Sequence, residues 1–313
     1  MKVGVLMGGP SGEHDISLKS GHGITEALRR RRIATEPLVI PRALTKAFAW
    51  TWVADSVRHL APDVIFIAVH GTFGQDGTLQ QLCEELHVPY TGSDPAASRL
   101  GMDKVASRTK FLAAGLQVPR WQVFNTVEGS VSDVSLPYPL VVKPISQGSS
   151  LGVSLVRTPE ELPVALNAAG QYGAHVLIEE FVQGREVTVG IFGDRVLPVV
   201  EIRPHQPFFD FAAKYTSGMT DYLVPAPLSA VMTQQVQAAG LLAYQALGCR
   251  HLSRVDIIVH KNGLPIILEV NTIPGFTPTS LLPKAAACAG LSYEDVCEHL
   301  VMMAATHTEM THV

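Results

Sequence analysis

Hydrophobic positions in the first third of the chain follow two alternating patterns. Short and almost wholly apolar runs at Lys2–Met7 and Val64–Val69 are typical of buried strands. Each is followed by a segment that repeats apolar residues at the spacing of one helix face, Ser17–Arg31 and Thr78–His87. Strands that alternate with helices predict a parallel sheet, whose ligands bind beyond the carboxyl ends of the strands.

The remainder of the chain changes from this alternation to strands joined by tight turns. A helix-rich passage, Pro95–Leu116, precedes the change. Later segments are predicted as strands at 140–144, 153–156 and 175–182, hairpins at 186–200 and 255–270, and helices at 229–247 and from Tyr293. The first hairpin is expected to turn at Gly193-Asp194. These shifts in pattern suggest boundaries between three parts near residues 95 and 180.

Composition and charge narrow the class of protein. With 47% hydrophobic and 17% charged residues among 313, the chain is able to bury a full core. No run approaches the roughly 18 apolar residues of a membrane helix, and Met1 does not begin a signal peptide, so we expect a cytoplasmic protein without a membrane partner. The net charge of −4 argues against a nucleic-acid partner. The run 29–32 of four arginines is interpreted as the cationic end of the first helix.

The four cysteines are scattered and form no paired spacing with one another or with histidines. A disulfide framework or a zinc site is therefore not expected. We interpret Cys83, Cys249, Cys288 and Cys297 as buried thiols.

The second hairpin carries the most informative polar pattern. Asn262-Gly263 between two β-branched runs predicts a two-residue type I′ turn. Counting outward from that turn pairs Asp256 with Glu269 and Arg254 with Asn271. Because side chains alternate along a strand, these four share one face. The opposite face is wholly apolar and is expected to join the core, with the residues Val255, Ile257, Val259, Ile266, Leu268 and Val270.

Two carboxylates that face each other across a hairpin repel one another. Either one of them is protonated or a cation lies between them. The oxygen donors of Asp256, Glu269 and Asn271 suit a hard cation such as Mg²⁺. The alternative is a solvated polar face on which Arg254 neutralises one of the two charges.

A divalent cation with oxygen ligands often accompanies phosphates, yet the common phosphate-binding motifs are absent from the sequence. Neither a Walker A motif nor a Gly-x-Gly-x-x-Gly motif after the first strand occurs. Lys143 precedes a Gly/Ser loop at 146–152 whose backbone N–H groups could cradle phosphate, although a hairpin linker with a surface lysine is an equally good interpretation. The segment 178–182 could meet an adenine edge, but its spacing alone favours an ordinary strand with solvent-facing acids.

Eight short motifs lie in order along the chain, from about residue 3 to residue 300. They occupy residues 8–17, 70–71, 102–104, 142–144, 148–152, 214–215, 254–256 and 269–277. Each is weak by itself, but the ordered set resembles the ATP-grasp family and, within it, the D-alanine–D-alanine ligase family.

The resemblance implies an α/β fold with three-domain ATP-grasp architecture. It places an N-terminal parallel α/β substrate-binding domain at 1–95, a central ATP-grasp lobe at 96–180 and a C-terminal ATP-grasp lobe with the metal site at 181–313. The two α+β lobes of this architecture enclose ATP. It also implies a homodimer.

The resemblance further implies a reaction, the ATP-dependent ligation of two D-alanines through an acyl phosphate during peptidoglycan precursor synthesis. Its cofactors are ATP as co-substrate and two Mg²⁺ ions, with Mn²⁺ as an alternative. Two other interpretations stay open: an ATP-grasp ligase that joins a different acid or amine, and a nucleotide-binding regulatory module without catalysis.

Site residues are carried over position by position. The resemblance implies metal ligands at Asp256, Glu269 and Asn271, and ATP-binding residues at Lys104, Lys143, Ser149, Glu179, Phe181, Val182, Glu186 and Lys214. It implies substrate-binding residues at Glu13, His70, Ser280 and Leu281. Arg254 and the Gly275 amide match the donors to the oxyanion of the tetrahedral intermediate. Glu13, Ser149 and Tyr215 match a hydrogen-bonded trio that closes a lid over the site.

Overall fold

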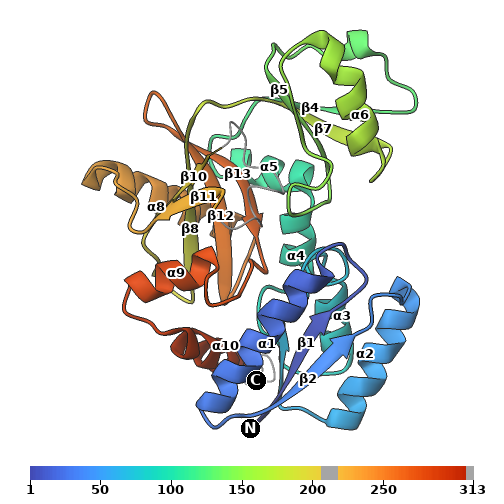
Figure 1. Cartoon of the computed structure of the whole chain (residues 1–313), viewed down its shortest axis with the longest axis vertical. Coiled ribbons are helices and arrows are strands. Elements are labelled where there is room, and N and C mark those ends of the chain that lie inside the picture. The colour runs from blue at the N-terminus through green and yellow to red at the C-terminus, as the bar shows by residue number, and fades with distance from the viewer. Residues whose placement is uncertain (206–217, 308–313) are drawn as a thin grey trace.

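The computed structural model describes residues 1–205 and 218–307, and a parallel sheet forms its N-terminal part (Figure 1). Its strands are ordered β2-β1-β3. The predicted parallel sheet is confirmed. The elements of this part are β1 (Lys2–Gly8), α1 (His14–Arg30), β2 (Ala34–Ile40), α2 (Lys46–Leu60), β3 (Val64–Ile67) and α3 (Thr78–Glu85).

Strand β2 and helix α2 were not predicted from the sequence. Pro37 and Glu36 interrupt the apolar pattern of β2. The proline is tolerated because β2 lies at the edge of the sheet, where β1 is its only partner among the described strands.

The central part is an antiparallel sheet with one helix packed on it. Its strands are ordered β4-β7-β5-β6. Strand β4 and helix α6 add to the predicted elements. The elements are α4 (Pro95–Met102), α5 (Lys104–Ala113), β4 (Trp121–Asn125), β5 (Leu140–Pro144), β6 (Ser154–Val156), α6 (Leu162–Gly170) and β7 (His175–Glu180), with 3₁₀ turns at Val131–Asp133 and Pro159–Glu161.

A second antiparallel sheet follows, ordered β11-β10-β8-β12-β13, with β9 paired to β8. The predicted hairpin turn at Gly193-Asp194 is confirmed. The elements are β8 (Gly184–Phe192), β9 (Arg195–Val196), β10 (Val200–Pro204), β11 (Thr220–Leu223), α8 (Ala230–Ala246), β12 (Leu252–His260), β13 (Pro265–Asn271), α9 (Leu281–Cys288) and α10 (Tyr293–His307). One parallel and two antiparallel sheets agree with the predicted α/β fold class.

The β12–β13 hairpin has the predicted pairing but not the predicted turn. The Gly263 N–H donates to the His260 carbonyl and Gly263 has a φ of +87°, so the loop is the three-residue stretch 261–263. The strand register near the turn is therefore shifted by one residue from the predicted register. An irregularity next to Asp256 shifts it back, and Asp256 pairs with Glu269 as expected.

The irregularity also changes which residues face the core. Val255, Ile257, Val259 and Val270 are buried as predicted. On β13, however, Ile267 is fully buried in place of the predicted Ile266 and Leu268, which are only partly buried. A β-bulge adds an unpaired residue, so the alternation of faces changes beyond it.

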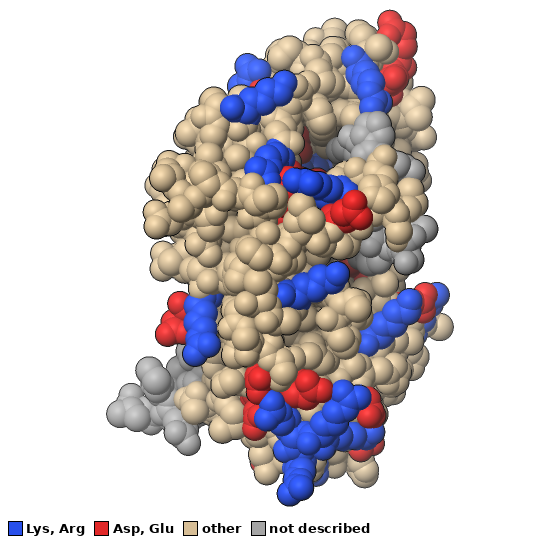
Figure 2. Space-filling model, turned by 60° about the vertical axis from the view of Figure 1, so that its left-hand side comes forward, with Lys and Arg blue, Asp and Glu red and all other residues tan. Residues whose placement is uncertain are grey.

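The C-terminal helices return to the N-terminal sheet and share one core with it. Val3 and Val5 of β1 pack in the same cluster as Leu282 of α9 and Leu300 of α10. At the surface, Arg30 pairs with Glu294 at 2.9 Å and Arg31 pairs with Asp295, which joins the end of α1 to the start of α10. Basic side chains gather beside acidic ones at this lower end of the molecule (Figure 2).

Among the described residues, no helix is both long and apolar enough to cross a membrane. Cys83, Cys249 and Cys297 are buried free thiols as predicted, whereas Cys288 is exposed near the end of α9. The prediction was wrong for Cys288 because the apolar face of this short helix is formed by other residues, including Leu282 and Ala286.

Candidate active site

Two cavities adjoin between the sheets, and the predicted site residues divide between them. The first cavity, about 420 Å³, lies between the two antiparallel sheets. The second, about 920 Å³, opens toward the N-terminal part. Gly148 and Glu269 line both. The first cavity is lined by the predicted residues Lys104, Lys143, Glu179, Phe181, Val182, Glu186, Asp256 and Glu269. The second is lined by Glu13, His70, Ser149, Arg254, Glu269, Asn271, Gly275, Ser280 and Leu281.

Strand alternation positions two of the charged groups of the first cavity. Within β5, Leu140 and Val142 enter the core, so Lys143 points to the opposite face. Glu179 of β7 pairs with Val141 across the sheet and therefore lies diagonally opposite Lys143. The Lys143 ammonium and the Glu179 carboxylate are 2.6 Å apart.

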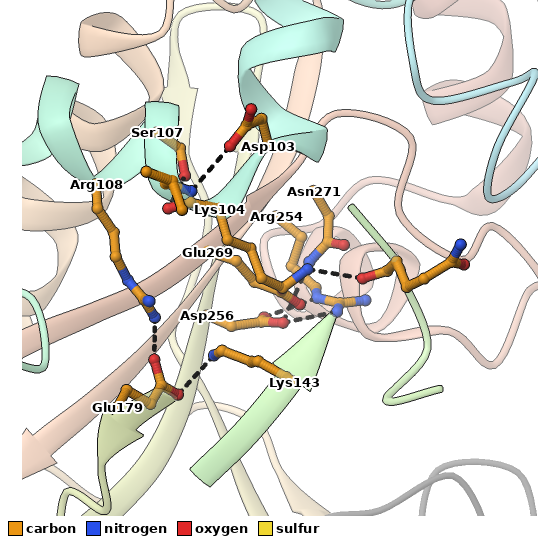
Figure 3. A network of polar contacts seen from close by, with 12 residues as sticks. Asp103, Lys104, Ser107, Arg108, Lys143, Glu179, Arg254, Asp256, Glu269 and Asn271 are labelled. Atoms are coloured by element: carbon orange, nitrogen blue, oxygen red, sulfur yellow. Dashed lines mark hydrogen bonds and ion pairs between the residues drawn. The ribbon is translucent and has the colours of Figure 1, made fainter. Parts of the chain in front are cut away.

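A third charge, Arg108, completes this buried cluster (Figure 3). Its guanidinium donates to Glu179 Oε2, and the Arg108 side chain is fully buried. Burial tends to raise the pKa of Glu179, but Arg108 and Lys143 together hold it below its usual value. Burial likewise lowers the pKa of Lys143 to about 8, although Glu179 opposes that shift. The cluster thus places the Lys143 ammonium, paired with Glu179, at the cavity wall.

Helix α5 brings a second lysine to the cavity at its first turn. The Asp103 carboxylate caps the helix by accepting from the backbone N–H groups of Val105 and Ala106. The Lys104 ammonium donates to the Gln147 carbonyl at 2.6 Å and lies 3.4 Å from Glu269 Oε2. Lys104 therefore joins the Gly/Ser loop at 146–152, called the glycine loop below, to Glu269 of β13.

The predicted metal-ligand face is present, and Asp256 already has several donors around it. The Arg254 guanidinium forks onto both carboxylate oxygens at 2.9 and 2.8 Å. Thr188 of the neighbouring strand donates to Oδ1 at 2.7 Å, and the Asn271 amide donates to Oδ2 at 3.2 Å. Arg254 thus neutralises Asp256, as in the alternative left open by the sequence, but the face is not solvated there, because Asp256 is buried.

This donor set nonetheless fits a hard cation. Asp256 and Glu269 face each other at the cavity wall, and the Asn271 amide has an oxygen to offer. Within the ranges that the structure describes, no group of three or more His, Cys, Asp or Glu residues could hold a metal. The candidate set instead combines two carboxylates with one amide.

In the second cavity, Glu13 connects the loop between β1 and α1 to the glycine loop. The Ser149 hydroxyl donates to Glu13 Oε1. A Cβ atom at Gly71 would lie 2.6 Å from Glu13 Oε2, and one at Gly148 would lie 3.1 Å from it. Glycine at both positions therefore allows the backbone to approach the carboxylate closely. Two members of the predicted trio meet in this way, whereas Lys214 and Tyr215 lie outside the described residues.

His70 lines the same cavity, but protein groups engage both of its ring nitrogens. Burial lowers the pKa of His70, so its ring is neutral near pH 7. Nδ1 contacts the Ile273 carbonyl at 3.2 Å, and Nε2 contacts the Ser20 hydroxyl at 2.9 Å. Ser20 also accepts from the Phe276 N–H at 3.3 Å. His70 and Ser20 thereby hold the loop that presents the Gly275 amide.

Ser280 and Leu281 stand where α9 begins. The Ser280 hydroxyl accepts from the Thr277 N–H at 2.9 Å. The first N–H groups of a helix lack internal partners and suit a carboxylate. Both residues line the second cavity, whereas Lys104 and Lys143 line the first.

Sequence reasoning missed three residues that support the site. Arg108 lies four positions after Lys104 on one helix face, and Thr188 lies two positions after Glu186 on one strand face. These spacings could have indicated, from the sequence, that Arg108 and Thr188 lie near the site. Ser20 carried no sequence signal, because only the tertiary structure places α1 beside residues 273–276.

Two family models match the chain. The model described as D-ala D-ala ligase C-terminus matches residues 79–302, and the one described as D-ala D-ala ligase N-terminus matches residues 52–93. A curated D-alanine–D-alanine ligase from Geobacter sulfurreducens is 42% identical over 306 residues, 97% of this chain and 94% of that protein. One from Trichlorobacter lovleyi is 42% identical over 310 residues, 98% of this chain and 96% of that protein.

Solved structures agree with these matches. The D-alanine–D-alanine ligase from Bacillus anthracis complexed with ATP has a TM-score of 0.85 and 31% identity, with full coverage of both chains. The VanG D-Ala:D-Ser ligase from Enterococcus faecalis has a TM-score of 0.83 and 32% identity, covering 97% of this chain and 99% of that one. By sequence along nearly its whole length and by fold, the chain belongs to the D-alanine–D-alanine ligase family.

Proposed function

We propose that the chain joins two D-alanines into D-alanyl-D-alanine with ATP, through an acyl phosphate, as a step of peptidoglycan precursor synthesis. The single observation that carries this proposal is the pair of adjoining cavities. One is lined by lysines and acids suited to a metal–nucleotide, and the other by groups suited to amino-acid substrates. The curated relatives of 41–42% identity, all named D-alanine–D-alanine ligase, support the same substrates.

In the first step, a carboxylate oxygen of one D-alanine attacks the γ-phosphorus of ATP, the bond to ADP breaks, and an acyl phosphate forms. Lys104 and Lys143 hold phosphate oxygens beside the wall between the cavities. Glu13 holds the ammonium group of this D-alanine. The contact of Ser149 with Glu13 closes the glycine loop over the site and excludes water that would hydrolyse the acyl phosphate.

In the second step, the amine of the other D-alanine attacks the acyl carbonyl carbon, and phosphate leaves from the tetrahedral intermediate. Arg254 and the Gly275 N–H donate to the oxyanion that develops. Ser280 and Leu281 receive the carboxylate of the second D-alanine. His70 acts on this step through the loop that carries Gly275.

Asp256, Glu269 and Asn271 would hold two Mg²⁺ ions, or Mn²⁺. Such ions offset the negative charge of a transferring phosphoryl group. Phe181, Val182 and Glu186 line the first cavity, where they would meet adenine and ribose. We place the enzyme in the cytoplasm, where ATP is available, as a homodimer.

The direct test measures phosphate release and dipeptide formation with ATP, Mg²⁺ and D-alanine. We expect one phosphate for each dipeptide. Release with another amino acid but none with D-alanine would favour a ligase of different specificity. Nucleotide binding without any amino-acid-dependent turnover would favour a regulatory module.

The low pKa of Lys143 predicts a pH dependence of nucleotide binding. Since phosphate favours the protonated lysine, binding above about pH 8 must include uptake of a proton, and affinity should fall by up to about tenfold for each further pH unit. Calorimetry in two buffers of different ionisation enthalpy measures that uptake. In Lys143→Arg, whose side chain stays charged, the dependence should disappear. Equal affinity at about pH 7 and about pH 9 in the unmodified chain would contradict this prediction.

The identity of the second substrate is tested at Tyr215. In depsipeptide-forming members of the family a phenylalanine occupies the matching position. We therefore expect Tyr215→Phe to gain D-lactate incorporation in a mixed assay with D-alanine. D-Serine belongs in the same assay, because a D-Ala:D-Ser ligase is among the similar structures. An unchanged product ratio would count against a role of Tyr215 in substrate choice.

A further inference from the structure

The buried carboxylate of Glu179 is shared between two cations that come from different elements (Figure 3). Oε1 contacts the Lys143 ammonium of β5 at 2.6 Å, and Oε2 accepts from the Arg108 guanidinium of α5. The exposed fractions of these side chains are 0% for Arg108, 5% for Glu179 and 9% for Lys143. All three charges are therefore largely removed from water.

The two cations differ in what they are able to reach. Lys143 lines the nucleotide cavity, whereas Arg108 is not among the described residues that line it. If the Lys143 ammonium turns to a phosphate, Glu179 loses this partner. A buried carboxylate without a counter-ion is strongly unfavourable, so this movement would be opposed if Lys143 were the only partner of Glu179.

We infer that Arg108 is a positioning residue that remains the counter-ion of Glu179 and so lets Lys143 exchange Glu179 for a nucleotide phosphate. The inference rests on the proposed function, in which Lys143 meets ATP. Arginine suits this role because its guanidinium keeps its charge when buried, and the helix holds it in place. Lys104 lies four residues earlier on the same helix and faces the cavity, so α5 supplies one cation to the nucleotide and one to Glu179.

The experiment is a double-mutant cycle on the affinity for a non-hydrolysable ATP analogue with Mg²⁺, measured by calorimetry. The variants are Arg108→Met, Glu179→Gln and the two combined. We expect Arg108→Met to weaken binding at least tenfold, because Lys143 is then retained by Glu179. In Glu179→Gln the neutral side chain no longer retains Lys143. The double variant should therefore bind within about threefold of Glu179→Gln. In turnover, Arg108→Met should raise KM for ATP and leave KM for D-alanine unchanged.

Arg108→Lys serves as the conservative variant and should bind within about threefold of the unmodified chain. If Arg108→Met does not fold, Arg108→Lys and the comparison of the double variant with Glu179→Gln still decide the question. If the double variant binds the analogue tenfold more weakly than Glu179→Gln, the inference is overturned. Equal affinity of Arg108→Met and the unmodified chain would overturn it as well. Either result leaves the proposed function standing. Failure of the unmodified chain to bind the analogue would instead overturn the proposed function, and the inference with it.

Discussion

Glu269→Gln should lower turnover by about a thousandfold while leaving the chain folded. The carboxylate faces Asp256 across the β12–β13 hairpin and lines both cavities, where the metal–nucleotide and the reacting carboxylate would meet. Loss of one metal ligand removes several kcal/mol of stabilisation from the transferring phosphoryl group, and each 1.36 kcal/mol is about a tenfold change in rate. The measurement is phosphate release at saturating ATP and D-alanine over a series of Mg²⁺ concentrations.

The fold should tolerate this substitution because the change has opposing effects. Glu269 loses its 3.4 Å pairing with Lys104, but its repulsion with Asp256 also disappears. The midpoint temperature of thermal unfolding of Glu269→Gln should therefore be close to that of the unmodified chain. Glu26→Gln, on the exposed face of α1, makes the same chemical change at a residue that lines neither cavity and should keep full activity. Near-normal turnover in Glu269→Gln would remove the metal assignment.

Arg254→Met should lower kcat by a factor of about 10² to 10³. Arg254 lines the second cavity and would donate to the oxyanion of the tetrahedral intermediate, an interaction that exists only as the reaction proceeds. KM for ATP should change much less than kcat. Arg254→Lys keeps the charge but cannot fork onto two acceptors, so its kcat should lie between those of the unmodified chain and Arg254→Met.

The matched control for Arg254 is Arg42→Gln, which removes an exposed ion pair with Asp15. Pairs of this kind contribute little to stability, so its activity and thermal unfolding should be unchanged. Dipeptide formation and phosphate release are measured together in all three variants. Retention of more than a tenth of the turnover in Arg254→Met would contradict the role of the guanidinium at the oxyanion.

Helix and strand patterns predicted much of the fold because burial imposes a period on each element. Strands β1 and β3 and the hairpin at Gly193-Asp194 follow directly from such local patterns. Strand β2 escaped prediction because its edge position tolerates Pro37, which in a central strand would remove a hydrogen bond. Edge positions are a property of the assembled sheet and leave no reliable mark in the sequence.

The pairing of Asp256 with Glu269 illustrates how far local rules extend. The expected turn was one residue too short, and the irregularity next to Asp256 restored the register. The same irregularity exchanged Ile267 for Ile266 and Leu268 in the core. A bulge depends on how the hairpin twists against its neighbouring strand, so the turn motif alone could not reveal it.

The sequence by itself determined which chemistry-bearing residues this protein has and the strand or helix that carries most of them, because these follow from side-chain type and local periodicity. Only the tertiary structure decided that Arg108 meets Glu179, that Ser20 reaches the loop of Gly275 and that Arg254 forks onto Asp256. Long-range contacts such as the first two join segments that are many residues apart. Their formation depends on the packing of whole elements, which no local pattern encodes.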